Sequence, residues 1–227
     1  MRGILYGVGI GPGDPELLTV KAIRILNEAD VIVFPGEVPE KTIAWSIIHS
    51  VVNLEGRELV GIPFPMTKDR MALDENHKNG ARVIRQYLDQ GLNVAFPTLG
   101  DPSVYSTFTY VNKILKEDGY DTRVIPGIPS FCAAAARINE PLGEEHEQIH
   151  IIPSSYDIEN ALNLPGTKVL MKAGRKIGYV IDDVNKKGLK MILAENIGMP
   201  EEKIVYNPTA DIEAGYYTQI IIKDNVR

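Results

Sequence analysis

The sequence comprises 227 residues, of which 44% are hydrophobic and 24% are charged. These proportions are typical of globular domains and exclude a disordered, collagen-like or disulfide-stapled chain. The formal net charge of −6 argues against a general electrostatic affinity for nucleic acid. The single cysteine, Cys132, rules out an intrachain disulfide and a zinc site built from several thiolates.

The N-terminal residues and the hydropathy favour a cytoplasmic protein with no membrane partner. Residues 1–6 lead directly into a glycine-rich loop and lack the apolar segment of a signal peptide. No apolar stretch approaches the roughly 20 residues that cross a bilayer.

In the first half of the chain, short β-branched runs alternate with helical patterns, which predicts βαβ units around a parallel sheet. We expect strands over residues 3–8, 31–34 and 92–96. A first helix is predicted to begin at Asp14, which serves as its N-cap, with Pro15 in the first turn. Its apolar stripe consists of Leu18, Ala22, Ile25, Leu26 and Ala29. Further helices are predicted over residues 42–51, 73–88 and 105–115.

The second half has more strands per helix, which predicts a mixed sheet with some antiparallel pairs. The expected strands are residues 122–125, 149–152, 168–171, 191–194, 203–206 and 217–222. Residues 116–121 are polar and turn-rich, so we place a domain boundary there. The predicted fold is α/β, with one domain over 1–117 and a second over 118–227.

The glycine-rich loop at residues 7–14 lies between the first predicted strand and helix. The G-x-G-x-x-G pattern of dinucleotide-binding folds fails here, because it requires glycine where Pro12 or Asp14 stands. A carboxylate at Asp14 would also repel a phosphate from the helix N-terminus. Two interpretations remain open: a loop that approaches a ligand, and a tight turn before a capped helix.

Two further motifs follow. Residues 97–107 come directly after the strand at 92–96, and residues 126–131 precede a run of four alanines at 133–136. Together with the glycine-rich loop, in this order and spacing, they resemble the tetrapyrrole methylase family over nearly the whole chain. Residues 99–107, 130–137 and 169–175 look most like its precorrin-2 C20-methyltransferase branch, although Pro129 departs from the threonine or serine of the family.

The resemblance implies two α/β domains with the active site in the cleft between them, and a homodimer. It implies S-adenosylmethionine (SAM) as methyl donor and methylation of C20 of precorrin-2 or cobalt-factor II in cobalamin (vitamin B12) biosynthesis. In this family, Gly100 would let backbone approach the donor, and Asp101 would accept a hydrogen bond from its amino group. The implied SAM-binding residues are Pro12, Leu99, Gly100, Asp101, Val104, Ser130, Phe131, Met171, Lys172, Ala173, Pro208, Thr209 and Ala210.

Catalysis is expected to be mainly positional, because SAM already carries an activated methyl group. Asp101 and Tyr105 are the candidate catalytic residues, for orienting the substrate or handling a proton. A polycarboxylate tetrapyrrole requires local positive charge in an acidic protein. The candidate substrate-binding residues, which include a histidine that could reach the macrocycle or a bound cobalt ion, are Lys68, Arg70, His77, Arg137, Arg175 and Lys176.

No metal site of the protein itself is predicted. His146 and His150 have helical spacing, but a polar loop entering a strand is the preferred interpretation. Cys132 is expected to pack as a small apolar side chain, and Trp45 to belong to the core. The alternative functions are methylation of uroporphyrinogen, of another corrin-ring position or of ribosomal RNA, diphthine synthesis, and a non-catalytic ligand-binding α/β module.

Overall fold

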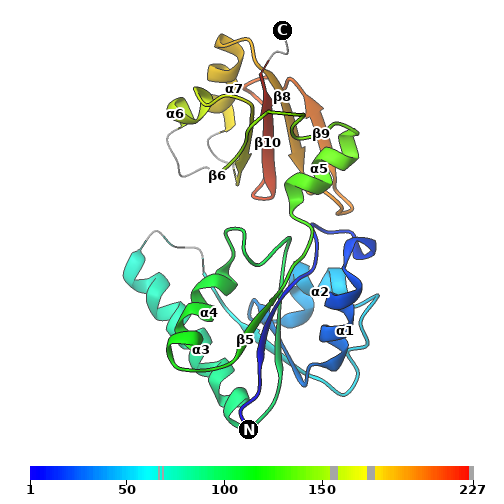
Figure 1. Ribbon diagram of the computed structural model, residues 1–227, viewed down its shortest axis with the longest axis vertical. Coiled ribbons are helices and arrows are strands. Elements are labelled where there is room, and N and C mark those ends of the chain that lie inside the picture. Colours follow the sequence, from blue (N-terminus) through cyan, green and yellow to red (C-terminus); the bar gives the residue numbers. More distant parts are fainter. Residues whose placement is uncertain (66, 68, 154–157, 173–176, 225–227) are drawn as a thin grey trace. The chain divides into compact units, whose positions relative to one another are not determined.

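The chain folds into two compact units, Met1–Pro129 and Ser130–Arg227, each with its own five-stranded sheet (Figure 1). The computed structural model describes residues 1–65, 67, 69–153, 158–172 and 177–224. The first unit ends later than the boundary predicted after residue 117. The reason is that β5 (Thr122–Ile125) pairs with β1 (Leu5–Gly9) in the first sheet. A turn-rich stretch therefore marked an ordinary helix-to-strand connection.

The first sheet is entirely parallel and has the strand order β3-β2-β4-β1-β5. Its remaining strands are β2 (Val31–Pro35), β3 (Glu58–Ile62) and β4 (Val94–Thr98). The edge strand β3 is absent from the sequence prediction, because most of its side chains are only partly buried and form no continuous apolar run.

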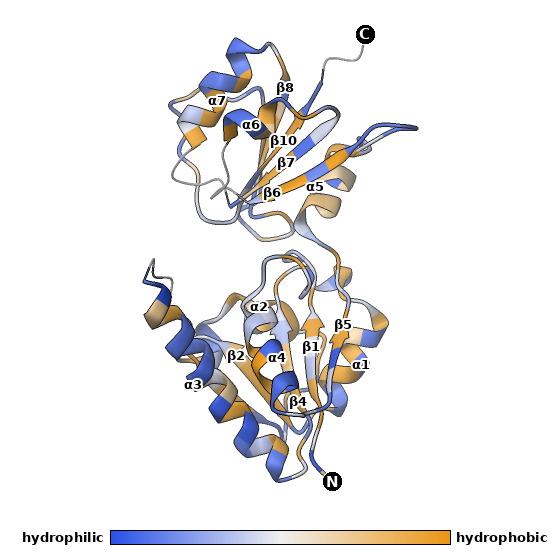
Figure 2. Cartoon of the chain, turned by 60° about the vertical axis from the view of Figure 1, so that its left-hand side comes forward, coloured by the Kyte–Doolittle hydropathy of each residue, from blue (hydrophilic) through white to orange (hydrophobic). Residues whose placement is uncertain are grey.

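Helices cover both faces of this sheet, with α1 and α2 on one side and α3 and α4 on the other (Figure 1). Figure 2 shows strands that are mainly hydrophobic and a hydrophilic outer side on α3. Each face has its own core cluster: Leu26, Phe34 and Ile47 belong to one, and Phe96 and Phe108 to the other. The helices are α1 (Val20–Glu28), α2 (Ile43–Ile48), α3 (Arg70–Asp89) and α4 (Thr107–Glu117), with short 3-10 turns η1 (Pro15–Leu17) and η2 (Pro39–Lys41).

The first predicted helix begins later than expected. Asp14 caps only η1, by accepting from the Glu16 N–H at 2.9 Å. Leu18 is extended, and α1 begins afterwards with its own N-cap, since the Thr19 hydroxyl accepts from the Ala22 N–H at 3.1 Å. The sequence offers two caps in succession, and the structure uses both. All five residues of the predicted apolar stripe are nevertheless buried, as expected.

The second sheet is mixed, as predicted, with the order β6-β7-β10-β8-β9. Only the β6–β7 pair is parallel, and the other three pairs are antiparallel. The strands are β6 (Ile149–Pro153), β7 (Thr167–Met171), β8 (Lys190–Glu195), β9 (Lys203–Tyr206) and β10 (Thr218–Lys223). The helices are α5 (Ser130–Ile138), α6 (Ile158–Leu162) and α7 (Ile177–Lys186), of which the last two were not predicted.

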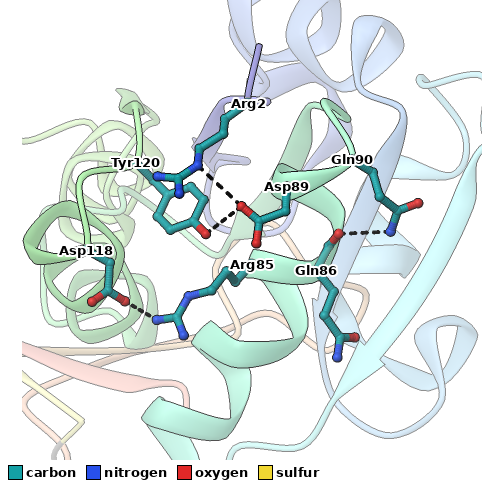
Figure 3. Close-up of polar contacts among 7 residues, drawn as sticks. All are labelled: Arg2, Arg85, Gln86, Asp89, Gln90, Asp118 and Tyr120. Atoms are coloured by element: carbon teal, nitrogen blue, oxygen red, sulfur yellow. Dashed lines mark hydrogen bonds and ion pairs between the residues drawn. The ribbon is translucent and has the colours of Figure 1, made fainter.

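A polar network holds the amino edge of the first sheet (Figure 3). The Tyr120 hydroxyl donates to Asp89 Oδ1 at 2.7 Å, and Arg2 Nε lies 3.4 Å from the same oxygen. Arg85 forms an ion pair with Asp118. These contacts tie the start of the chain to the end of α3 and to the turn before β5. Among the described helices, none combines the length and apolar character needed to cross a membrane.

Candidate functional site

The three sequence motifs meet at the carboxyl edge of the first sheet. β1 lies between β4 and β5, and in register Gly9 is opposite Thr98 while Val8 is opposite Ile125. From this edge the chain continues from β1 to α1 on one face, and from β4 to α4 on the other. Such a change of direction is the topological switch point at which open α/β sheets bind ligands.

The glycines at this edge pack backbone against backbone. The Gly100 N–H donates to the Gly11 carbonyl at 2.7 Å, and the Gly11 N–H donates to the Gly100 carbonyl at 3.3 Å. A Cβ atom on Gly9 would lie 2.4 Å from the Gly127 nitrogen, and one on Gly127 would lie 2.2 Å from the Gly100 carbonyl oxygen. Both distances are too short for a carbon contact. Glycine is therefore required here so that the three loops can touch one another.

Glycine is required at position 7 for a different reason. A Cβ atom there would lie 2.3 Å from the ring of Phe108, which is buried in the second core cluster. Packing thus explains why glycine is needed at positions 7 and 9 of this loop.

Asp101 is 9% exposed, and its carboxylate is bound by the chain itself. Oδ1 accepts from the Ser103 N–H at 2.8 Å and from the Ser103 hydroxyl at 2.5 Å, while Oδ2 accepts from the Gly127 N–H at 2.9 Å. Burial raises the pKa of Asp101, but these hydrogen bonds outweigh it and hold the pKa below its usual value. The edge therefore contains a buried, ionised carboxylate.

Of the predicted donor-binding and catalytic residues, the others in the first unit lie on the same two loops. Pro12 and Gly100 are buried, whereas Leu99 and Val104 are half-buried. Tyr105 is 45% exposed and has a left-handed backbone with φ of 47°. The reciprocal bonds between Gly11 and Gly100 bring these two loops together.

In the second unit, Ser130 and Met171 lie beside a residue that the sequence did not single out. The Ser130 hydroxyl donates to Gln219 Oε1 at 3.0 Å, and Gln219 Nε2 donates to the Ser130 carbonyl at 2.9 Å. In register, Gln219 is opposite Met171. Its only signal in the sequence is a polar side chain within an apolar strand, which resembles that of many exposed strand residues.

Lys172 follows Met171 with a left-handed backbone, and its Nζ lies 5.8 Å from the ring centroid of Tyr216. Phe131 is half-buried in the first turn of α5. Tyr216 and its neighbour Tyr217 contact each other edge to face. Lys172, directly after β7, therefore borders a tyrosine pair that directly precedes β10.

The loop of Pro208, Thr209 and Ala210 follows β9. Pro208 is buried, while Thr209 and Ala210 are exposed. A Cβ atom on Gly178 would lie 3.0 Å from the Ala210 carbonyl oxygen, which places this loop against the first turn of α7. Ala173 lies outside the described residues.

Of the candidate substrate-binding residues, Lys68, Arg175 and Lys176 also lie outside the described residues. Arg70 is exposed at the first position of α3. His77 stacks on Tyr110 with ring centroids 4.6 Å apart, and burial, opposed by Asp74, lowers its pKa.

Arg137 has a protein partner, since its Nε lies 2.5 Å from Glu202 Oε1. The Gly198 N–H donates to the other carboxylate oxygen of Glu202 at 2.9 Å. Glu202 thus connects the last turn of α5 to the connection between β8 and β9.

Cys132 is exposed, so the prediction that it packs as an apolar side chain is wrong. It lies on the side of α5 away from the buried Ala133–Ala135. Although the residue as a whole is exposed, partial desolvation of its thiol raises the pKa of that group, which disfavours a reactive thiolate. Trp45 packs against the first core cluster, as expected. The described part of the chain contains no group of three metal-ligating side chains.

Similar proteins point in one direction. A family model described as Tetrapyrrole (Corrin/Porphyrin) Methylases matches residues 4–213. A probable cobalt-precorrin-2 C(20)-methyltransferase of Methanocaldococcus jannaschii is 39% identical over 209 residues, which cover 92% of this chain and 89% of that protein. A cobalt-precorrin-2 C(20)-methyltransferase of Salmonella typhimurium is 33% identical over 178 residues, or 76% and 73% of the two chains.

The fold has solved counterparts. The uroporphyrin-III C-methyl transferase from Thermus thermophilus, in complex with S-adenyl homocysteine, superposes with a TM-score of 0.71. The superposition covers 97% of both chains at 22% sequence identity, which shows a shared fold.

Proposed function

The chain belongs to the tetrapyrrole (corrin/porphyrin) methylase family, and from this premise we propose that it methylates C20 of precorrin-2 or of its cobalt-bearing form, cobalt-factor II, with SAM as the donor. The observation that carries the proposal is 39% identity to a C20-methyltransferase over 92% of the chain. The reaction belongs to cobalamin biosynthesis.

The carboxyl edge of the first sheet suits the donor. The bound donor supplies an electrophilic methyl group on a positively charged sulfonium sulfur. Asp101 provides a buried negative charge at this edge, which favours a cationic ligand electrostatically. Leu99 and Val104 present half-buried apolar surface for an adenosine group. We therefore assign donor binding to Pro12, Leu99, Gly100 and Val104, with Asp101 as the charged group.

In the second unit, we assign donor binding to the residues around the start of α5 and the end of β7. The bond to Gln219 fixes the rotamer of Ser130 while leaving the hydroxyl oxygen able to accept. The assigned residues are Ser130, Phe131, Met171, Lys172, Ala173, Pro208, Thr209 and Ala210.

The protein's catalytic contribution is alignment of the nucleophilic carbon with the methyl group. Good alignment alone contributes up to about 7–11 kcal/mol. We propose Tyr105, which is exposed and directly follows Val104, as the group that orients the substrate or accepts a proton.

For the substrate carboxylates we propose Lys68, Arg70, His77, Arg175 and Lys176. Arg137 belongs to the same proposed set; its Nε pairs with Glu202, and its side chain is 62% exposed. Replacement of a residue of this set, such as Arg175→Ala, should raise the half-saturating tetrapyrrole concentration and leave SAM affinity unchanged. We further propose a cytoplasmic homodimer. Light scattering of the purified protein tests the dimeric state.

Mass spectrometry of the product tests the function. The protein is incubated with SAM and either cobalt-free or cobalt-bearing precorrin-2, and the expected product carries one additional methyl group. Binding of SAM without transfer to either tetrapyrrole would point instead to methylation of another substrate, such as uroporphyrinogen or the diphthine precursor. A chain that does not bind SAM would be a non-catalytic module.

A further inference from the structure

The hydrogen bonds of Asp101 cross the end of a strand. Ser103 lies on the loop after β4, and Gly127 lies on the segment after β5. β4 and β5 do not pair, because β1 separates them in the sheet. The Asp101 carboxylate therefore joins two loops over the C-terminal end of β1, where Gly9 lies.

Backbone atoms pack closely around Gly9, beneath this connection. Gly9 is the last residue of β1, and a Cβ atom on it would meet both the Gly127 nitrogen and, at 2.9 Å, the Gly100 carbonyl oxygen. The loop after β4 and the segment after β5 thus both lie close to the position that a Cβ atom on Gly9 would occupy.

The acceptor capacity of Asp101 is mostly used. A carboxylate has about four acceptor positions. Three of them are filled by the two donors of Ser103 and the N–H of Gly127. One acceptor position remains, on Oδ2, so most of the hydrogen bonding of Asp101 serves to join the two loops.

We propose that Asp101 is a positioning residue, which clamps the loop of Leu99, Gly100 and Val104 to Gly127 and so fixes its shape for the methyl donor without bonding the donor's amino group. This inference rests on the proposed function. It assigns to Asp101 a role distinct from the direct amino-group contact that the family resemblance implies.

Asp101→Asn tests the clamp with little change of shape. The amide oxygen can still accept from Ser103, but the amide NH₂ then faces the Gly127 N–H, so that two donors oppose each other. Isothermal titration gives the affinities for S-adenosylhomocysteine and for its desamino analogue, 5′-S-(3-carboxypropyl)-5′-thioadenosine. The two ligands differ only in the amino group.

A positioning role predicts that Asp101→Asn weakens both ligands about tenfold or more. The missing carboxylate charge adds only a smaller loss for S-adenosylhomocysteine, whose amino group is cationic. Ser103→Ala, which removes one of the three donors, should weaken both equally and by less. It also keeps the test decisive if Asp101→Asn does not fold. Asp118→Asn, at the opposite edge of the sheet, is the control and should leave both affinities unchanged (Figure 3).

Two results would overturn the inference. Weakened binding of S-adenosylhomocysteine alone would show a direct bond to the amino group. A lower melting temperature with both affinities unchanged would show a purely structural role. Failure of the unaltered protein to bind S-adenosylhomocysteine would instead refute the proposed function, and the product assay reports on that separately.

Discussion

Ser130 and Gln219, which are 89 residues apart in the sequence, exchange two hydrogen bonds. Gln219 is 3% exposed and lies in the centre strand of the second sheet, so the pair fastens the first turn of α5 to the sheet. Because Ser130 is a proposed donor-binding residue, the bonds link the stability of this unit to its ligand affinity.

Gln219→Leu should lower the free energy of unfolding by about 1–3 kcal/mol, since the hydroxyl and carbonyl of Ser130 lose their partner. The affinity for S-adenosylhomocysteine should fall as well. Urea unfolding and titration calorimetry measure the two effects. Gln86→Leu, on the exposed face of α3, is the control. Unchanged ligand affinity in Gln219→Leu would remove Ser130 from the proposed donor site.

Gly9→Ala should destabilise the first unit by about 1–3 kcal/mol, because its Cβ overpacks against backbone atoms that cannot rotate away. It should also weaken S-adenosylhomocysteine binding, since Gly127 and Gly100 must separate to admit the methyl group. In the control, Gly143→Ala, the nearest atoms belong to the side chain of Ile149, which can adjust. Equal melting temperatures for the two variants would contradict the close loop packing.

Lys168 and Asp224 should respond unequally to substitution. The Lys168 side chain is 1% exposed and pairs with Asp224, whose side chain is 44% exposed. Asp224→Asn leaves a buried ammonium group without its counter-charge and should cost up to about 3 kcal/mol, less than a fully buried pair because water reaches position 224. Lys168→Met removes the buried charge and should be neutral or stabilising. Urea unfolding measures both stability changes. A larger loss of stability in Lys168→Met than in Asp224→Asn would contradict this expectation.

Tyr87→Phe should lower the melting temperature at neutral pH, with the deficit disappearing in strong alkali. The Tyr87 hydroxyl donates to Glu58, and this bond, together with burial and the glutamate charge, raises the pKa of Tyr87 to about 12. Because the pKa is raised in the folded state, the bond contributes its full stabilisation at pH values below the unfolded-state pKa of about 10. This stabilisation is lost as the pH rises towards the folded-state pKa. Thermal melts across this range, with exposed Tyr179→Phe as control, measure it. A deficit that persists at the highest pH would show that the bond does not involve the neutral hydroxyl.

The sequence predicted an element closely where one property of its own residues is enough to identify it. The apolar run of β2 and the strand over β5 were predicted closely, because burial on both faces or β-branched composition is visible in the residues themselves. The start of α1 was misplaced because Asp14 caps only the short turn η1, and the prediction did not include Thr19, which caps α1. β3 lacked a signal because an edge strand is only partly buried.

By itself, the sequence determined the family, the α/β class, the mixed character of the second sheet and the positions of the three motifs. These properties depend on residue type and spacing along the chain. Only the tertiary structure decided why the glycines are needed, what Asp101 bonds to, and that Gln219 supports Ser130. Each of these depends on which strands become neighbours. The order β4-β1-β5 brings together residues that are far apart in the chain, and nothing in their sequence positions predicts the contact.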